Sequence, residues 1–259
     1  MIINYFRPQT LDEALKLLAQ PDARPLGGGT WLNQPHDEKF SVVDLQALGL
    51  TKIRKAGNNL EIDACVTLQQ LLESTHCPAA LTQALRLESA LNIRNVATVA
   101  GVLVACDGRS TFATAMLALD ARLTVDRGPQ TEAGLLSTVY GLVEYLTTRP
   151  QGLITKITIP LNARLAFESV ARSPMDQPIV CAAIARWAAG RTRLALGGTG
   201  NSPTLAMDGT ESDGIEASIN SAQAAAKNAF HGASDEWASA EYRMDVAATL
   251  AKRCLETVK

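Results

Sequence analysis

The apolar positions near the start of the chain follow helical spacing first and extended spacing later. Between residues 10 and 20 the leucines recur at helical intervals, and Thr10 precedes Glu13 by three residues, the spacing of a capping box. This pattern predicts an amphipathic helix that ends near Pro21. Residues 23–32 (ARPLGGGTWL) predict a glycine-rich turn, and residues 41–45 (SVVDL) predict a short strand.

The middle of the chain alternates between extended and helical patterns. Residues 53–64 alternate around Gly57, Asn58 and Asn59, which predicts a hairpin. Thr67 and Gln70 have the spacing of a second capping box, which predicts a helix start, and helical spacing continues through residues 79–91.

A small-residue segment at residues 93–110, here called the second segment, predicts a loop that leads into a buried helix. That helix is predicted at residues 111–121 and is followed by a strand at residues 122–126. Residues 152–159 (GLITKITI) place Leu153, Thr155, Ile157 and Ile159 on one face, which predicts a strand that Pro160 ends.

The last hundred residues predict strands followed by helices. Residues 179–190 and 191–198 predict two strands that turn at Gly190, and two Ala-rich stretches, 216–230 and 237–257, predict helices. Residues 207–214 predict an exposed loop.

We therefore expect an α+β protein in two parts. We place the boundary between residues 160 and 165, which gives domains of residues 1–162 and 163–259. The smaller C-terminal domain offers mainly packing surface, and we expect its charged residues Arg193, Glu241 and Arg243 to be solvated.

Composition narrows the class of partner. The 259 residues are 47% hydrophobic and 19% charged, and the formal net charge is -2. Such a chain has no basic field for nucleic acid, so a small molecule or a protein is the expected partner. The sequence begins without the features of a signal peptide, and no apolar run approaches the ~20 residues of a membrane span, so we expect a cytoplasmic protein.

Cysteine and histidine spacing argues against a metal centre. The five cysteines contain no CxxC pair, so we expect them to be reduced and mostly buried, and the three histidines are isolated in the sequence. We also find no paired carboxylates and no His/Cys nucleophile arrangement, and we therefore predict no catalytic side chain and no bound metal. These residues are Cys65, Cys77, Cys106, Cys181, Cys254, His36, His76 and His231.

Glycines suggest where a ligand could bind. The run from Leu26 to Thr30 lets backbone N–H groups approach an anion and permits positive φ, both of which suit a diphosphate. It lacks the GxGxxG spacing of a Rossmann fold and the GK[ST] ending of a P-loop. Glycines also occur at tight turns for purely conformational reasons, and the small residues from Thr98 to Val102 could equally serve close packing.

At these two places the sequence resembles the FAD-binding medium subunit of the molybdenum hydroxylases, the family that includes xanthine and carbon monoxide dehydrogenases. The family motif AGGTDL corresponds to GGGTWL at residues 27–32, here called the first loop. The motif IRNxATIGGNLxxAxPxSDLPxALLALDA corresponds to residues 93–121 without a gap. Further similar segments, which together cover nearly the whole chain, are FRPQTLDEAL, LEIDACVTLQQL, GLITKITIP, RLALGGTGNSPTLA and ASAEYRMDVAATLAKRCLE.

The resemblance implies a two-part FAD-binding domain of two α/β subdomains, followed by a C-terminal domain of the CO dehydrogenase flavoprotein type. It implies that Gly28, Gly29 and Thr30 bind the diphosphate of FAD with the first loop, flanked by Gly27 and Leu32. Replacing Gly29 with Val should then abolish flavin binding without unfolding the domain.

From the second segment, Thr98 and Gly101 are implied to bind the diphosphate. Ile93, Arg94 and Asn95 would shape the approach to it. The other interpretation of these three residues is a helix C-terminus, with Arg94 solvated and Ile93 in the core.

Four positions depart from the family pattern. Trp31 replaces the Asp of AGGTDL, Ala100 the first Gly of GGN, Val102 its Asn, and Thr111 the Asp of SDLP. Trp31, Ala100 and Val102 remain candidate contacts, but Val and Trp offer no acceptor for a ribose hydroxyl. Ala100 would cost roughly 1 kcal/mol if its position required positive φ. Trp31 could compensate by stacking on adenine or flavin.

The resemblance therefore implies an electron-transfer subunit. Its partners would be a large subunit with the molybdenum cofactor and a small iron–sulfur subunit, and its FAD would pass electrons to an acceptor such as NAD. The four departures support a second hypothesis, a degenerate structural or assembly subunit that does not bind FAD. A third is that the glycine loops bind another nucleotide or an isolated acyl-carrier-like ligand.

Overall fold

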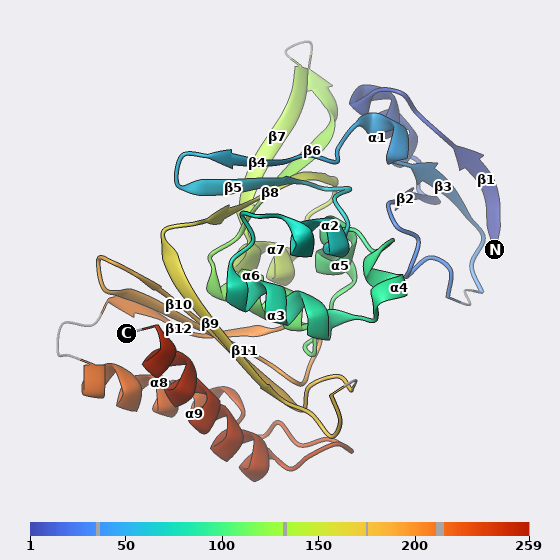
Figure 1. Cartoon of the computed structure of the whole chain (residues 1–259). Helices are drawn as coiled ribbons and strands as arrows, with labels where there is room; N and C mark the ends of the chain where they lie inside the picture. The colour runs from blue at the N-terminus through green and yellow to red at the C-terminus, as the bar shows by residue number, and fades with distance from the viewer. Residues whose placement is uncertain (35–36, 132–133, 175, 211–214, 259) are drawn as a thin grey trace.

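The structure is a computed structural model in which the strands that are described form three sheets (Figure 1). Its description covers residues 1–34, 37–131, 134–174, 176–210 and 215–258.

The first sheet is parallel and has the order β1-β3-β2, with helix α1 (Leu11–Leu18) between β1 and β2 in the chain. All five residues of its central strand are buried. Thr10 caps α1 by accepting the Glu13 N–H at 3.2 Å, but the Glu13 carboxylate accepts from the Gln9 N–H and not from Thr10, so the capping box is only half formed. The strands are β1 (Ile2–Phe6), β2 (Ala23–Leu26) and β3 (Phe40–Asp44).

Strands β1 and β2 are absent from the sequence-based expectation, which was wrong in giving residues 23–26 to a turn. Both are edge strands. Residues Ile2 to Tyr5 are exposed and so show no alternation, and β2 contains Pro25, which normally argues against a strand.

The second sheet is antiparallel, with the order β4-β5-β8-β6-β7. The predicted hairpin is confirmed, with Gly57 at φ 60° in its turn, and so is the central strand that was predicted at residues 152–159. The strands are β4 (Ile53–Ala56), β5 (Asn59–Asp63), β6 (Arg122–Thr131), β7 (Gly134–Gly141) and β8 (Leu153–Pro160).

Short helices fill the space between this sheet and the third one (Figure 1). The capping box at Thr67 and Gln70 is complete, and all eight residues of α6 are buried, as predicted. Residues 99–105 form a helix where a loop was expected, because Thr98 caps it and its small apolar residues pack on the core. The helices are α2 (Leu68–Glu73), α3 (Ala79–Glu88), α4 (Leu91–Arg94), α5 (Val99–Ala105), α6 (Thr111–Ala118) and α7 (Leu142–Thr148), with a 3₁₀ turn at Gln46–Leu48.

The third sheet is antiparallel in the order β12-β11-β10-β9, with α6 contacting β10 and β11 and with helix α9 contacting β9 and β10. The two strands and two helices predicted here are confirmed. Residues 207–210 belong to β12 and not to a loop, while residues 211–214 lie outside the described part of the chain. The elements are β9 (Ala163–Val170), β10 (Val180–Trp187), β11 (Arg191–Gly197), β12 (Thr204–Thr210), α8 (Ile215–Ala229) and α9 (Ala240–Thr257).

Two arginines of the C-terminal domain are buried, contrary to expectation, whereas Glu241 is exposed as expected. Arg193 donates to the carbonyl oxygen of Leu117 at 3.1 Å and pairs with Asp120 and Asp208. These contacts compensate the charge that burial would otherwise leave unpaired.

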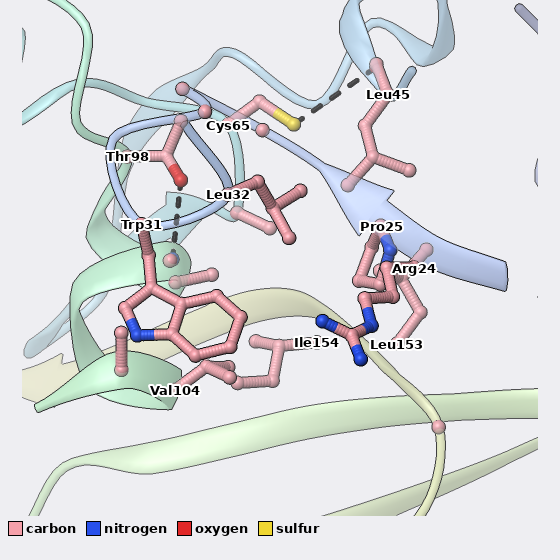
Figure 2. A pocket seen from close by; sticks show the side chains of 18 of the residues that line it. Arg24, Pro25, Trp31, Leu32, Leu45, Cys65, Thr98, Val104, Leu153 and Ile154 are labelled. Carbon is pink, nitrogen blue, oxygen red and sulfur yellow. Dashed lines mark hydrogen bonds between the residues drawn. The ribbon is translucent and has the colours of Figure 1, made fainter. Parts of the chain in front are cut away.

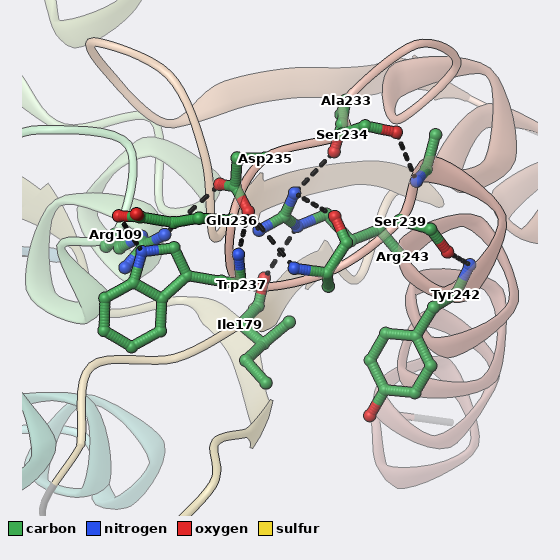
Figure 3. A network of polar contacts seen from close by, with 12 residues as sticks. Arg109, Ile179, Ala233, Ser234, Asp235, Glu236, Trp237, Ser239, Tyr242 and Arg243 are labelled. Carbon is green, nitrogen blue, oxygen red and sulfur yellow. Dashed lines mark hydrogen bonds and ion pairs between the residues drawn. The ribbon is translucent and has the colours of Figure 1, made fainter.

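The second buried arginine, Arg243, has an exposed fraction of 0%. It donates to the carbonyl oxygens of Ile179 and Ala238 at 3.3 and 3.2 Å and pairs with Asp235 at 2.7 Å (Figure 3). Arg243 thereby gives its buried guanidinium N–H groups acceptors, from carbonyl oxygens and a carboxylate.

All five cysteines are free, as expected, but only Cys181 and Cys254 are fully buried. His76 and His231 are exposed, and His36 lies outside the described residues. Across the described ranges, no cluster of side chains could hold a metal ion, and no helix is long and apolar enough to cross a membrane.

Candidate functional site

The first loop and the start of α5 meet in backbone-to-backbone contact. A Cβ atom built on Gly28 would lie 1.8 Å from the carbonyl oxygen of Val96, and one on Gly27 would lie 2.9 Å from Thr98 Oγ1. Glycine is therefore required at residue 28 for this close approach. Gly29 has φ 70°, so Val at this position would strain the backbone, and the expectation that such a variant stays folded loses its basis.

A cavity of about 410 Å³ opens beside this contact (Figure 2). This volume lies within the range of about 300–1,000 Å³ that is typical of ligand pockets. Nine of the eleven predicted site residues line it, namely Gly27, Gly28, Gly29, Thr30, Trp31, Leu32, Thr98, Ala100 and Gly101.

The remaining two candidates, Ile93 and Val102, do not line the cavity. Val102 packs against the core, and Ile93 is 39% exposed on α4, so it is not the core residue that the helix-terminus interpretation expected. That interpretation is right about Asn95, which ends α4. It is wrong about Arg94, which donates to Gln69 Oε1 at 3.1 Å and to the Arg86 carbonyl oxygen at 3.2 Å.

Two of the family departures have different consequences from those expected. Ala100 lies within α5 in helical conformation, so no positive φ is needed there. Thr111 lies buried in α6, where its hydroxyl donates to the Ala84 carbonyl oxygen at 2.7 Å, and it does not line this cavity.

The first loop offers backbone donors to the cavity. Within the described residues, no group accepts a hydrogen bond from the backbone N–H of Gly27, Gly28, Gly29 or Thr30. All four residues are half-buried, and half-buried N–H groups without a protein acceptor favour a bound anion. The residues of the first loop therefore suit the diphosphate of a dinucleotide.

The first turn of α5 offers no such donors. The N–H groups of Val99 and Ala100 donate to the carbonyl oxygens of Val66 and Ala64, at 2.8 and 3.3 Å. The Gly101 N–H donates to Thr98 Oγ1 at 3.1 Å. What remains for a ligand from this turn is the hydroxyl hydrogen of Thr98.

Sequence reasoning missed the far wall, which comes from the connection between α7 and β8. Arg149 ends α7 at φ 44° and donates to the Val104 carbonyl oxygen at 2.9 Å, so it also caps α5. The Pro150 and Gly152 turn carries the only sequence signal for this wall. Other lining residues that sequence reasoning missed include Arg24, Cys65, Val104, Tyr145, Leu153 and Ile154.

The thiol and the phenol that line the cavity, Cys65 and Tyr145, keep their protons near pH 7. Burial raises the pKa of Cys65 to about 11, and the charges of Asp44 and Asp63 add to the shift. Burial also raises the pKa of Tyr145, against the opposing effect of Arg149. The cavity therefore presents neither a thiolate nor a phenolate at neutral pH.

Comparison with known proteins decides the family. Residues 1–162 match the family described as the FAD binding domain in molybdopterin dehydrogenase. The chain belongs to this family. Residues 165–258 match the CO dehydrogenase flavoprotein C-terminal domain, which confirms the two-domain fold and the resemblance seen in the sequence.

Relatives of this FAD-binding family align along nearly the whole chain. The chain is 29% identical over 255 residues to the Escherichia coli protein YgfM, covering 96% of this chain and 94% of that protein. It is 28% identical over 281 residues to the carbon monoxide dehydrogenase medium chain of Afipia carboxidovorans, covering 99% and 96%.

Solved structures agree with this assignment. Reconstituted CO dehydrogenase from Oligotropha carboxidovorans matches with a TM-score of 0.80 and 26% identity, over 99% of this chain and 97% of that chain. Quinoline 2-oxidoreductase from Pseudomonas putida shares the fold, with a TM-score of 0.77 at 22% identity over 99% of this chain and 96% of that chain. The chain is thus a flavoprotein-type subunit of the molybdenum hydroxylase class of oxidoreductases, and FAD is the cofactor of its family.

Proposed function

We propose that this chain carries FAD as the electron-transfer subunit of a molybdenum hydroxylase complex. Its partners are a large subunit with the molybdenum cofactor and a small iron–sulfur subunit. The observation that carries the proposal concerns the residues from Gly27 to Thr30, which line the cavity and whose backbone N–H groups meet no acceptor among the described residues. Family membership over both domains supports the same assignment.

The residues of the chain bind and position the cofactor. The N–H groups of the first loop would hold the diphosphate, and the Thr98 hydroxyl, which lies beside Gly27, would donate a further hydrogen bond. When bound, FAD supplies the electron transfer from iron–sulfur clusters to an acceptor such as NAD. The chain places the cofactor and limits its access to water, and no side chain acts as an acid or base.

The proposal includes the division of the chain. The FAD-binding domain comprises residues 1–162, and the C-terminal domain comprises residues 163–259. The cofactor contacts in the FAD-binding domain are Gly27, Gly28, Gly29, Thr30, Trp31, Leu32, Thr98, Ala100 and Gly101. The complex works in the cytoplasm. We do not include Ile93 and Val102 among the cofactor contacts, because they do not line the cavity.

A structural or assembly subunit without flavin is the second candidate. It is favoured by the first turn of α5, whose N–H groups at Val99, Ala100 and Gly101 all donate within the protein. Each missing hydrogen bond between the protein and a charged ligand reduces the binding free energy by about 1.5–3 kcal/mol. Binding by the first loop alone is therefore weaker than binding by both segments.

Flavin release separates the two candidates. The purified chain is denatured, and the supernatant is examined for the absorption spectrum of free flavin; chain that carries none is then incubated with FAD. Released flavin or saturable uptake of FAD supports the electron-transfer subunit. If the chain neither releases flavin nor takes up FAD, the proposal is overturned. Co-purification of the chain with a molybdenum-containing large subunit tests the partners independently.

A further inference from the structure

Trp31 stands where the family motif has an aspartate, directly after the donor groups of the first loop. An indole ring has one N–H donor and no acceptor, so Trp31 cannot make the hydrogen bonds of that carboxylate. What it adds to the site is a large flat ring. The substitution therefore changes the kind of contact that this position can make.

The ring of Trp31 lies at the cavity with much of its surface open. Trp31 is 47% exposed and lines the cavity (Figure 2). The other two tryptophans do not line this cavity. The ring of Trp237 has the guanidinium groups of Arg109 and Arg172 over it, at 4.3 and 4.2 Å, and Trp187 is half-buried.

The wall next to Trp31 is apolar. Figure 2 shows the indole ring above Val104, with Ile154 to one side, and both residues line the same cavity. Val104 is 50% exposed although it is apolar. A planar ring that covered these groups would remove apolar surface from water, which is favourable by about 25 cal/mol per Å².

We propose that Trp31 stacks on a planar ring of the bound dinucleotide, either adenine or isoalloxazine. The proposal rests on the proposed binding of FAD, whose diphosphate is held by Gly28, Gly29 and Thr30 of the same loop. Because the ring and the N–H donors are adjacent in the chain, one ligand with a diphosphate and an attached aromatic ring reaches both. Stacking offsets part of the hydrogen bonding that is lost with the family's Asp and Asn side chains.

The test is a titration of the intact chain with FAD, followed by tryptophan fluorescence and by calorimetry. Trp31→Ala should raise the Kd about tenfold, which corresponds to about 1.4 kcal/mol, whereas Trp31→Phe should raise it by less than about threefold because it keeps an aromatic ring. Tyr242→Ala is the matched control, since Tyr242 is 45% exposed at the start of α9 and does not line the cavity. It should leave the Kd unchanged.

Fluorescence gives a second readout that a purely structural role would not change. If Trp31 stacks on the ligand, most of the FAD-dependent quenching disappears in Trp31→Phe, which retains the fold and both other tryptophans. Titrations with ADP and with FMN then identify the ring, because only the fragment whose ring stacks should bind Trp31→Ala more weakly than wild type.

Equal affinity of wild type and Trp31→Ala for FAD overturns the stacking proposal and leaves the proposed function in place. Full quenching in Trp31→Phe also overturns it. If wild type binds no FAD at all, the proposed function fails and the stacking proposal fails with it. Circular dichroism shows whether Trp31→Ala is folded. If it is misfolded, the fluorescence quenching of Trp31→Phe decides the stacking proposal.

Discussion

The backbone N–H of Gly198 donates a hydrogen bond of 2.6 Å to the carbonyl oxygen of Gly108. The N–H of Gly108 donates in turn to the carbonyl oxygen of Gly200 at 2.9 Å. The segment before α6 and the end of β11 are so close that a Cβ atom on Gly108 would lie 1.8 Å from the Thr199 carbonyl oxygen. The N-terminal and C-terminal parts are therefore joined through their backbones.

Side chains reinforce this junction next to Gly108. The Arg109 guanidinium lies 4.3 Å from the ring centre of Trp237 and 3.2 Å from the Asp235 carboxylate (Figure 3). The Arg172 guanidinium also lies over this ring, 4.2 Å from its centre. The C-terminal domain thus holds the chain between α5 and α6, next to the helix that lines the cavity.

Gly108→Ala should loosen this junction. The added methyl group meets backbone atoms that cannot rotate away, so we expect a loss of about 3 kcal/mol in the free energy of unfolding. Urea denaturation measures it. Gly209→Ala is the control, because Gly209 is exposed and a Cβ there meets nothing within 4 Å. Equal stability of the two variants would contradict the prediction.

Gly28→Ala should separate the first loop from the second segment. Its Cβ would clash with the Val96 carbonyl oxygen at 1.8 Å, so the loop and its N–H groups must move. We expect a loss of about 2 kcal/mol in stability and an FAD affinity at least about tenfold weaker. Calorimetric titration and thermal unfolding measure the two effects. A folded variant with wild-type FAD affinity would show that the first loop does not hold the ligand.

Thr98→Val removes the cap of α5 together with the hydroxyl that faces the cavity. Loss of a Thr cap costs about 1 kcal/mol of stability. Thr67 caps α2 in the same way but does not line the cavity, so Thr67→Val is a matched control. We expect both variants to lose similar stability and only Thr98→Val to bind FAD more weakly. If the affinities of both fall equally, the Thr98 hydroxyl makes no contact with the ligand.

Much of the fold was predictable because its inner elements bury one regular face. Strand β8 alternates along most of its length and α6 is buried throughout, and both were predicted. The edge strands β1, β2, β7, β9 and β12 were not, because an edge strand has less of its surface buried and its 2-residue alternation is weak. The edge strand β4 was predicted from the turn signal of its hairpin.

The site was predictable where a motif specifies backbone geometry. The close approach to Val96 requires glycine at residue 28, and this glycine is the only sign of that contact in the sequence. The wall at Arg149 carries no motif, because it is assembled from a connection that lies far away in the chain. The burial of Arg193 and Arg243 could not be read from the sequence either, since it depends on carboxylates and carbonyl oxygens that only the tertiary structure brings beside them.

Cys65 makes the stability of the protein fall at alkaline pH. Its pKa is about 11 in the folded chain, against an ordinary value of 9.0, because burial and the charges of Asp44 and Asp63 disfavour the thiolate. The stabilisation is complete below pH 9, where both states keep the proton. Between about pH 9 and 11 the unfolded state ionises first, so the free energy of unfolding decreases as pH rises, by on the order of 2 kcal/mol for this group.

Cys65→Ala removes this contribution and should flatten the pH dependence of the free energy of unfolding above pH 9, as measured by urea denaturation. Near neutral pH, the difference in free energy of unfolding between the variant and wild type should stay constant. The wild-type thiol should also react slowly with iodoacetamide at neutral pH. Its rate should increase about tenfold per pH unit up to its pKa, because only the thiolate reacts. In urea the same thiol should titrate near its ordinary value. A folded-state midpoint near pH 9 would mean that the Cys65 thiol is open to water, and the cavity wall between β3 and β8 would then have to be wider than the structure shows.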